Sequence, residues 1–276
     1  MADDAQVEQF LGFTGQRHID IAQLWVAREA GKIVWTSLPI VSPGRTALLF
    51  TPADRWDGHA AGELVEAASS WAAGLGVHLL QLLLDPQLAG ARELFAGHQF
   101  QFIAELRYLQ AHVRAREAFP ALPVGMAWEL YSQSSHDRFA KAIAATYEDS
   151  LDCPGLAGLR SIEDIIAGHK AGGEFDARYW YLLRLNAQPV AVVLLNRLSG
   201  GSAAELTYLG VAPEARRRGV GRLLVLQALA GAAAMGARTI TLAVDAANVP
   251  ALRMYHRHGF RQVSSKIALM RDLRNC

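Results

Sequence analysis

Residues 205–222, ELTYLGVAPEARRRGVGR, constrain the fold of this chain more than any other segment. The first part alternates and favours β-structure, which predicts a strand that ends before Pro213. An arginine-rich turn follows, and Gly219-Val220-Gly221 then opens a long apolar segment that predicts a buried helix. We therefore expect a strand, a glycine turn and a helix start in immediate succession.

This arrangement favours the binding of a phosphate group. Glycines allow the backbone to approach a ligand closely, and the start of a helix offers free N–H groups and the positive end of the helix dipole. Cationic side chains surround the turn, namely Arg216, Arg217, Arg218 and Arg222. Together these features predict a phosphate seat.

Several kinds of site share such a turn. A nucleoside-triphosphate loop requires a lysine after its last glycine, and none follows Gly221. A dinucleotide-binding loop requires a third glycine where this chain has Leu224, although Asp245 lies at a suitable distance for a ribose contact. An arginine-rich surface turn before a core helix explains the glycines equally well. The residues that follow the turn distinguish between these kinds of site.

Those residues complete a recognisable pattern. The spacing Arg216-x-x-Gly219-x-Gly221, followed by Asn248, Tyr255 and Gly259-Phe260, resembles the GNAT superfamily of acyl-CoA-dependent N-acyltransferases. The resemblance covers about residues 126–272. It implies an α/β (α+β) fold in which helices flank a mixed, mostly antiparallel twisted sheet, with acetyl-CoA as the acyl donor and no metal.

The resemblance also implies where coenzyme A binds. The turn would hold the pyrophosphate, and the preceding strand would splay open and grip the pantetheine arm, with the Val211 N–H as the oxyanion donor. The implied coenzyme-binding residues are Leu209, Gly210, Val211, Arg216, Arg217, Arg218, Gly219, Val220, Gly221, Arg222 and Asn248.

Glu205 is the candidate general base. It lies six residues before Val211, where histone-acetylating members of the family carry theirs, and strand alternation predicts that it shares a face with Thr207 and Leu209. A carboxylate with a pKa of about 4.3 is a poor base for an ammonium, so it would act through water or with a raised pKa. The alternative is an ordinary solvated glutamate at the start of a strand.

Tyr255 is the candidate general acid, because the tyrosine at this position in the family reaches the coenzyme sulfur. A phenol with a pKa of about 10 can protonate a thiolate whose conjugate acid has a pKa of about 8.5. The alternative is a tyrosine that packs its ring against the sheet.

The front half repeats the order of the back half. Pro52, Gly58, Asp85, His98 and Phe100 recur at nearly constant spacing as Pro213, Gly219, Asp245, His258 and Phe260. This predicts two tandem GNAT domains, a degenerate one over residues 1–115 and a catalytic one over residues 124–276.

The front copy lacks the chemistry of the back copy. Leu88, Phe95 and Gly44 stand where the second copy has Asn248, Tyr255 and Glu205, and Asp54 and Asp57 flank the equivalent turn. We therefore expect a structural or substrate-shaping role for it. A second, noncatalytic coenzyme A site is the alternative.

Composition excludes several functional classes. The formal net charge of +1 predicts no general affinity for nucleic acid or for an anionic membrane. Residues 1–10 do not resemble a signal peptide, and the apolar runs fall short of the roughly 20 residues that span a bilayer. Two cysteines provide no disulfide framework, so we expect a cytoplasmic protein.

Other candidate residues favour ordinary roles. His256 and His258 point in different directions on a helix, which argues against a metal site. Cys153 has no nearby histidine in the sequence, so we expect a loop cysteine. Glu148, Asp149 and Asp152 fall where family members bind the acceptor, although a solvated helix end explains them as well.

The sequence thus predicts direct transfer of an acetyl group from acetyl-CoA to a primary amine, with a small molecule favoured over a protein as acceptor. The alternatives are a noncatalytic acyl-CoA-binding regulatory module and a nucleic-acid-binding arginine loop. The second of these would require a broader basic face than a net charge of +1 suggests. The acceptor, the acyl length and the oligomeric state stay open.

Overall fold

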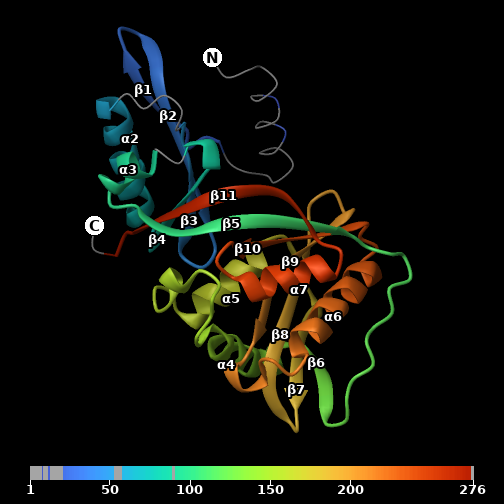
Figure 1. The fold of residues 1–276 in the computed structure, drawn as a ribbon. Coiled ribbons are helices and arrows are strands. Elements are labelled where there is room, and N and C mark those ends of the chain that lie inside the picture. Colours follow the sequence, from blue (N-terminus) through green and yellow to red (C-terminus); the bar gives the residue numbers. More distant parts are fainter. Residues whose placement is uncertain (1–7, 9–11, 13–20, 53–57, 89–90, 275–276) are drawn as a thin grey trace. The chain divides into compact units, whose positions relative to one another are not determined.

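The computed structural model describes residues 21–52, 58–88 and 91–274, together with Glu8 and Gly12 (Figure 1). Most of residues 1–10, and both Asp54 and Asp57, lie outside the described residues. The chain divides into two compact units. Unit 1 runs up to Ile103 and resumes at Lys266, and unit 2 spans Ala104–Ser265.

Unit 1 is a strand layer with the order β1-β2-β3-β4-β11. Neighbours are antiparallel except β3 and β4, which are parallel because helix α2 crosses between them. The elements are β1 Trp25–Glu29, β2 Lys32–Ser42, β3 Thr46–Phe50, α2 Gly58–Gly74, β4 Leu79–Leu84, α3 Ala91–Ala96 and β11 Arg261–Asp272, of which residues from Lys266 belong to this unit.

An ion pair fixes α2 to β11 inside unit 1. Arg271 is 4% exposed, and its guanidinium donates to both Glu66 carboxylate oxygens at 2.9 and 2.8 Å. His98 contacts the same carboxylate at 2.9 Å. Burial raises the pKa of Glu66, but the hydrogen bonds and charges of Arg271 and His98 outweigh it and leave that pKa below its usual value.

Unit 2 has the strand order β5-β10-β9-β8-β7-β6. Only β9 and β10 run parallel; the other neighbours are antiparallel. The elements are β5 Gln101–His112, β6 Met126–Leu130, α4 His136–Tyr147, α5 Ile162–Ala171, β7 Glu174–Leu185, β8 Gln188–Arg197, β9 Ala203–Val211, α6 Val220–Ala234, β10 Thr239–Asp245 and α7 Val249–Arg257. A mixed, mostly antiparallel sheet flanked by helices confirms the predicted fold class.

Two apolar cores lie on opposite faces of the unit 2 sheet. Helix α6 packs Leu224, Val225 and Ala228 against one face, as its nearly uniform apolar sequence predicted. Helices α4 and α5 cover the other face with Phe139 and Ile166 among their buried residues. None of the helices in the described part of the chain combines the length and apolar character needed to cross a membrane.

The compact units do not follow the ranges 1–115 and 124–276. Those ranges assign β5 to the first domain and β11 to the second. Strand pairing instead places residues 106–112 of β5 beside β10 and residues 267–272 of β11 beside β4. Each unit therefore contains a strand from the other half of the sequence.

Arg216 connects the end of α4 to the end of β9. Its Nε donates to the Val211 carbonyl at 3.0 Å, and its terminal nitrogens donate to the carbonyls of Thr146, Glu148 and Asp149 at 3.3, 2.5 and 3.2 Å. One guanidinium thus satisfies four carbonyls that the helix end and the strand end leave without intrahelical or ladder partners.

Glu66→Gln should lower the free energy of unfolding by about 1–3 kcal/mol, because it removes the negative charge that the buried Arg271 guanidinium contacts, less a discount for the 44% exposure of Glu66. The folded-state pKa of Glu66 lies below its usual value of 4.5. The ion pair therefore contributes its full stability above pH 4.5, and this contribution is lost as the pH falls through the folded-state pKa, so wild type and variant should converge at low pH. Urea unfolding at pH 7 and pH 4 measures both effects. Glu63→Gln on the same helix, at a side chain 71% exposed, is the control; equal losses in the two variants would contradict the prediction.

Arg216→Lys should cost about 1–3 kcal/mol of unfolding free energy, because one ammonium cannot reach carbonyls spread around a planar guanidinium. The exposed neighbouring Arg218→Lys should change that energy by no more than about 0.5 kcal/mol. Urea unfolding followed by tryptophan fluorescence compares the two. An Arg216→Lys protein as stable as wild type would show that the four hydrogen bonds contribute nothing to the free energy of unfolding.

Candidate active site

Strands β9 and β10 separate partway along their length. They pair only from Thr239↔Ala203 to Thr241↔Glu205, whereas β10 stays paired with β5 along its whole length. Beyond Glu205 a cavity of about 580 Å³ opens, lined by residues 206–211 of β9 and residues 242–244 of β10. The splayed strand that the family resemblance implied is therefore present.

A β-bulge at Thr207 marks the point of separation. Leu194 of β8 pairs with Tyr208, but the adjacent Leu195 pairs with Leu206, so Thr207 is the extra residue. Strand alternation changes there. Leu206 and Leu209 both pack with the α6 core, and Tyr208 packs with the α4 core. The expectation that Glu205 shares a face with Leu209 is therefore wrong, because the bulge inserts one residue between them.

Close packing against α4 shapes the cavity wall after the bulge. The Tyr208 hydroxyl lies 2.8 Å from Thr146 Oγ1, and a Cβ on Gly210 would stand only 2.5 Å from that same oxygen. Only glycine fits this approach. Tyr208 also stacks between Tyr147 and His169, with ring centroids 5.3 and 5.1 Å away.

This aromatic stack is neutral at physiological pH. Burial raises the pKa of Tyr147 to about 12, and burial also raises the pKa of Tyr208. Burial, with a smaller effect from the Arg160 charge, lowers the pKa of His169 to about 4. Tyr208 and Thr146, which line the cavity, therefore present an aromatic ring and hydroxyl groups without charge.

The arginine turn meets the cavity at the start of α6. Gly219 caps the helix with a φ of 79°, a left-handed conformation that suits glycine. Arg217 and Gly221 line the cavity, and Arg217 is exposed. Arg216 also lines it, with its guanidinium bonded to four carbonyls. Arg217 and the N-terminus of α6 thus supply positive charge here.

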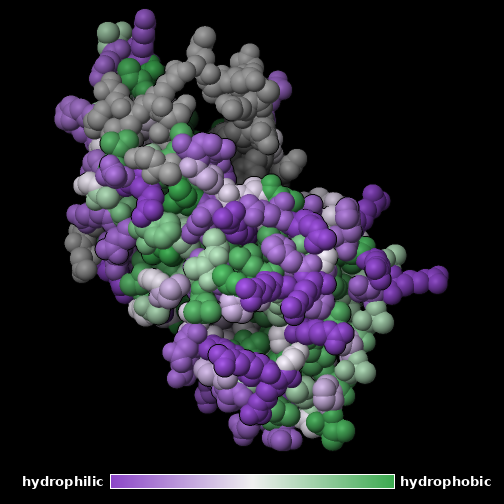
Figure 2. Space-filling model, viewed as in Figure 1, coloured by the Kyte–Doolittle hydropathy of each residue, from purple (hydrophilic) through white to green (hydrophobic). Residues whose placement is uncertain are grey.

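Arg222 lies elsewhere. It lines a separate groove of about 690 Å³ between α6 and α7, together with Arg253, Arg257 and His258. Figure 2 shows hydrophilic side chains gathered over α7. The sequence interpretation missed Arg253 and Arg257, although their spacing of four residues places them on one side of a helix.

Tyr255 and Asn248 come from α7 and its N-terminus. Asn248 accepts the Ala251 N–H at 3.3 Å and so caps the helix, and both Asn248 and Tyr255 line the cavity. Tyr255 is 6% exposed and packs on Phe260 with ring centroids 5.5 Å apart. Burial, then the charge of Asp152, raises the pKa of Tyr255, so its phenol stays protonated and is a weaker acid than a free phenol.

Asp152 and Asp245 hold two loops together beside Tyr255. The Asp245 N–H donates to Asp152 Oδ1 at 2.8 Å, and the Cys153 N–H donates to Asp245 Oδ2 at 3.1 Å. Asp245 Oδ1 accepts the Ala247 N–H at 2.8 Å. Both oxygens of Asp245 accept backbone hydrogen bonds, and the residue is only 4% exposed and does not line the cavity, so it is unsuited to the ribose contact considered above.

Glu205 lies at the edge of this arrangement. It is half-buried at the last β9–β10 pair and is not among the residues that line the cavity. The pKa of Tyr108 on β5 is raised by burial and then by the charge of Glu205, which places the carboxylate near that phenol.

The structure thus gathers most, but not all, of the predicted site. The predicted residues that line the cavity are Leu209, Gly210, Val211, Arg216, Arg217, Gly221, Asn248 and Tyr255. Glu205, Arg218, Gly219, Val220 and Arg222 do not line it. In the described ranges, no three His, Cys, Asp or Glu side chains are arranged to hold a metal ion.

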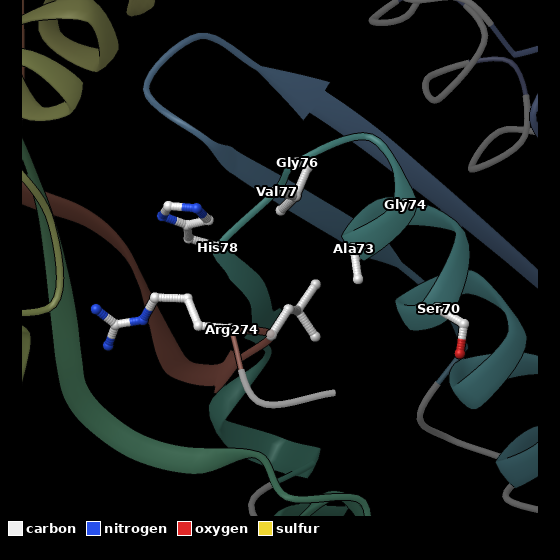
Figure 3. A pocket seen from close by; sticks show the side chains of 8 residues that line it. Ser70, Ala73, Gly74, Gly76, Val77, His78 and Arg274 are labelled. Carbon is white, nitrogen blue, oxygen red and sulfur yellow. The ribbon is translucent and has the colours of Figure 1, made fainter.

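Unit 1 contains a hollow that lacks the features of a phosphate site (Figure 3). It lies at the C-terminal end of α2, where Ala73 and Gly74 meet His78 and Arg274. The carbonyl end of a helix carries partial negative charge and does not favour phosphate. Arg274 pairs with Asp272, and His78 lies 3.0 Å from Arg45.

Comparison with known proteins supports one family. Residues 143–260 match the acetyltransferase (GNAT) family. The chain is 28% identical over 195 residues to a mycothiol acetyltransferase of Clavibacter michiganensis, covering 66% of this chain and 58% of that protein's length. It is 25% identical over 218 residues to one from Actinosynnema mirum, covering 74% and 72%.

Solved structures share the fold at low identity. A GCN5-related N-acetyltransferase from Sphaerobacter thermophilus aligns with a TM-score of 0.64 and 17% identity, over 97% of this chain and 85% of that one. A tandem GNAT protein from the clavulanic acid biosynthesis pathway aligns with a TM-score of 0.55 and 15% identity, over 100% and 97%. The splayed strands and the glycine turn agree with the acetyltransferase (GNAT) family match over residues 143–260, and the solved structures show that the fold is shared.

Proposed function

We propose that this protein transfers an acetyl group from acetyl-CoA directly to a primary amine. The observation that carries the proposal is the cavity between β9 and β10, whose lining includes Arg216 and Arg217 of the arginine turn as well as Tyr255. A single pantetheine arm connects pyrophosphate to thioester in coenzyme A, so one such channel serves both ends of the donor. Two relatives named mycothiol acetyltransferase favour a small-molecule acceptor over a protein.

In this proposal the donor lies along the open edge of β9. Its pyrophosphate binds near Arg217 and the α6 N-terminus, where helix N–H groups and positive charge favour an anion. The β9 backbone from Leu209 to Val211 binds the pantetheine amides, because the ladder to β10 ends at Glu205. The Val211 N–H stabilises the oxyanion of the tetrahedral intermediate.

The acceptor amine must lose a proton before it attacks the acyl carbon. Glu205 takes that proton through a water molecule, because the carboxylate does not itself line the cavity. The nitrogen–carbon bond forms, the carbon–sulfur bond breaks, and the departing sulfur takes the Tyr255 proton. The second proton on nitrogen returns to the phenolate through solvent. The products are the acetylated amine and free coenzyme A.

The residues of unit 1 that the structure describes offer no equivalent chemistry, and we assign the unit a noncatalytic role as a degenerate tandem copy. Phe95 is fully buried in its core and carries no hydroxyl. Leu88 and Gly44 likewise offer neither an amide nor a carboxylate. In this proposal, residues 124–276 form the catalytic copy of the same repeated domain.

A noncatalytic acyl-CoA-binding module is the second candidate. It would use the same turn and the same open strand edge. The position of Tyr255 in the cavity weighs against it, because a binding module has no need of a phenol beside the thioester. The match to the Clavibacter protein spans only 58% of that protein's length.

Tyr255→Phe should lower kcat for acetyl transfer by about 100-fold, since it removes the proton donor for the thiolate and little of the ring packing. The dissociation constant for acetyl-CoA should change less than about twofold. Coenzyme A release, followed with a thiol reagent over a panel of primary amines, measures the first quantity. Tyr179→Phe, outside the cavity, should retain wild-type turnover; unchanged turnover in Tyr255→Phe would refute the assignment.

Calorimetric titration with acetyl-CoA should give one site per chain. Gly221→Asp should weaken that binding at least about tenfold, because a Cβ there stands 2.9 Å from Met254 Sδ and the carboxylate repels phosphate. Gly74→Asp adds the same charge where nothing lies within 4 Å and should bind normally. Two sites would contradict the role given to unit 1, and no binding would refute the proposed function.

A further inference from the structure

Strand β5 brings a tyrosine from the first half of the sequence into the sheet of unit 2. Tyr108 pairs with Ala243 of β10. Two residues earlier on β10, Thr241 pairs with Gln110 of β5 on one side and with Glu205 of β9 on the other. Directly paired side chains project from one face of a sheet, and alternate residues of a strand share that face. Tyr108 and Glu205 therefore project from the same face, two strands apart.

This face is the one opposite α6. The residues that alternate with Tyr108 and Glu205 along the three strands lie in the α6 core, namely Ala204, Leu109, Ile240 and Leu242. On the other face, α4 packs over β8 and β9, and α5 packs over β7. Ala243 of β10 is exposed there and lines the cavity. The cavity thus reaches the face of the sheet that carries Tyr108 and Glu205.

Tyr108 and Glu205 are close enough to act on each other. Neighbouring strands are about 4.8 Å apart, so about 10 Å separates β5 from β9, and the side chains of Thr241 and Ala243 between them are short. Burial raises the pKa of Tyr108, and the charge of Glu205 raises it further. The phenol therefore keeps its proton at neutral pH, so it is a hydrogen-bonding group beside the carboxylate and not a second base.

A water molecule between the cavity and Glu205 needs more than one partner. The next step rests on the proposed function, in which Glu205 acts through water because its carboxylate does not line the cavity. An ordered water makes about three hydrogen bonds. The carboxylate and the acceptor amine provide two of them, and Tyr108 is the hydroxyl group that the pairing of β5 with β10 brings to the same face.

We propose that Tyr108 is a positioning residue whose hydroxyl holds the water molecule through which Glu205 removes the proton from the acceptor amine. The water accepts a proton from the amine nitrogen as it gives one of its own to the carboxylate, so the water is regenerated and the phenol keeps its proton. Tyr108 lies within residues 1–115, the range that the sequence assigns to the degenerate copy. The first half of the sequence thus contributes a residue to the reaction of the second.

Tyr108→Phe tests this role, because it keeps the ring and removes only the hydroxyl. With the best acceptor from a panel of glucosamine, putrescine, L-cysteinamide and benzylamine, kcat should fall about 5-fold to 10-fold, as expected for the loss of one hydrogen bond. KM for the amine and Kd for acetyl-CoA should each change less than about twofold, since neither ligand loses a direct contact. Tyr179→Phe, outside the cavity, is the matched control and should resemble wild type.

A double-mutant cycle separates a role in holding water from a role in packing. Glu205→Gln removes the base, so adding Tyr108→Phe to it should lower kcat by less than about twofold more. A packing defect would lower kcat equally in both backgrounds, and that result would overturn the proposal. An O-alkylhydroxylamine, which is uncharged at pH 7, has no proton to lose before attack. With this nucleophile Tyr108→Phe should lose less than about twofold in kcat, and a loss equal to that for the amine would also overturn the proposal.

Two further outcomes separate this role from the proposed function. An unchanged kcat in Tyr108→Phe, or a loss that appears in KM instead, would overturn the role of Tyr108 and leave acetyl transfer intact. Wild-type protein that binds acetyl-CoA but acetylates no amine in the panel would refute the proposed function and this role with it.

Discussion

The end of the β9–β10 ladder at Glu205 is the constraint on which the rest of unit 2 depends. Two parallel neighbours that stayed paired would leave no opening, and the backbone from Leu206 onward would be fully used within the sheet. The separation is tolerated because β10 keeps its antiparallel partner β5 along its other edge, and β9 keeps β8. The cavity is thus a local interruption in a sheet that is otherwise intact on both sides.

The arginines of one short turn perform different tasks because the helix start divides them. Arg216 turns back and bonds the carbonyls at the ends of α4 and β9, which fixes the cavity wall. Arg217 stays at the cavity, and Arg222, in the first turn of α6, reaches the groove between α6 and α7. Arg218 is exposed and lines neither. Four arginines that look alike in the sequence therefore have different surroundings in the structure.

Elements with strong local signals could be predicted from the sequence. The strand over residues 203–211 and the helix opened by Gly219 occur as expected, because alternation and glycine placement are local properties. The bulge at Thr207 could not be foreseen, since a single extra residue leaves the strand pattern looking regular. The contact of Asp152 with Asp245 joins residues far apart in the chain, and only the assembled sheet brings them together.

The placement of β11 has a consequence for synthesis. Strand β4 lies in the first third of the sequence, yet its antiparallel neighbour within unit 1 is residues 267–272. A ribosome must therefore continue as far as residue 272 before β4 can pair along that edge, and until then the N–H and C=O groups on that edge of β4 lack their partner strand in unit 1. Unit 2 takes only β5 from the first half of the sequence and ends at Ser265, so its residues are all translated before residues 267–272 emerge to complete unit 1.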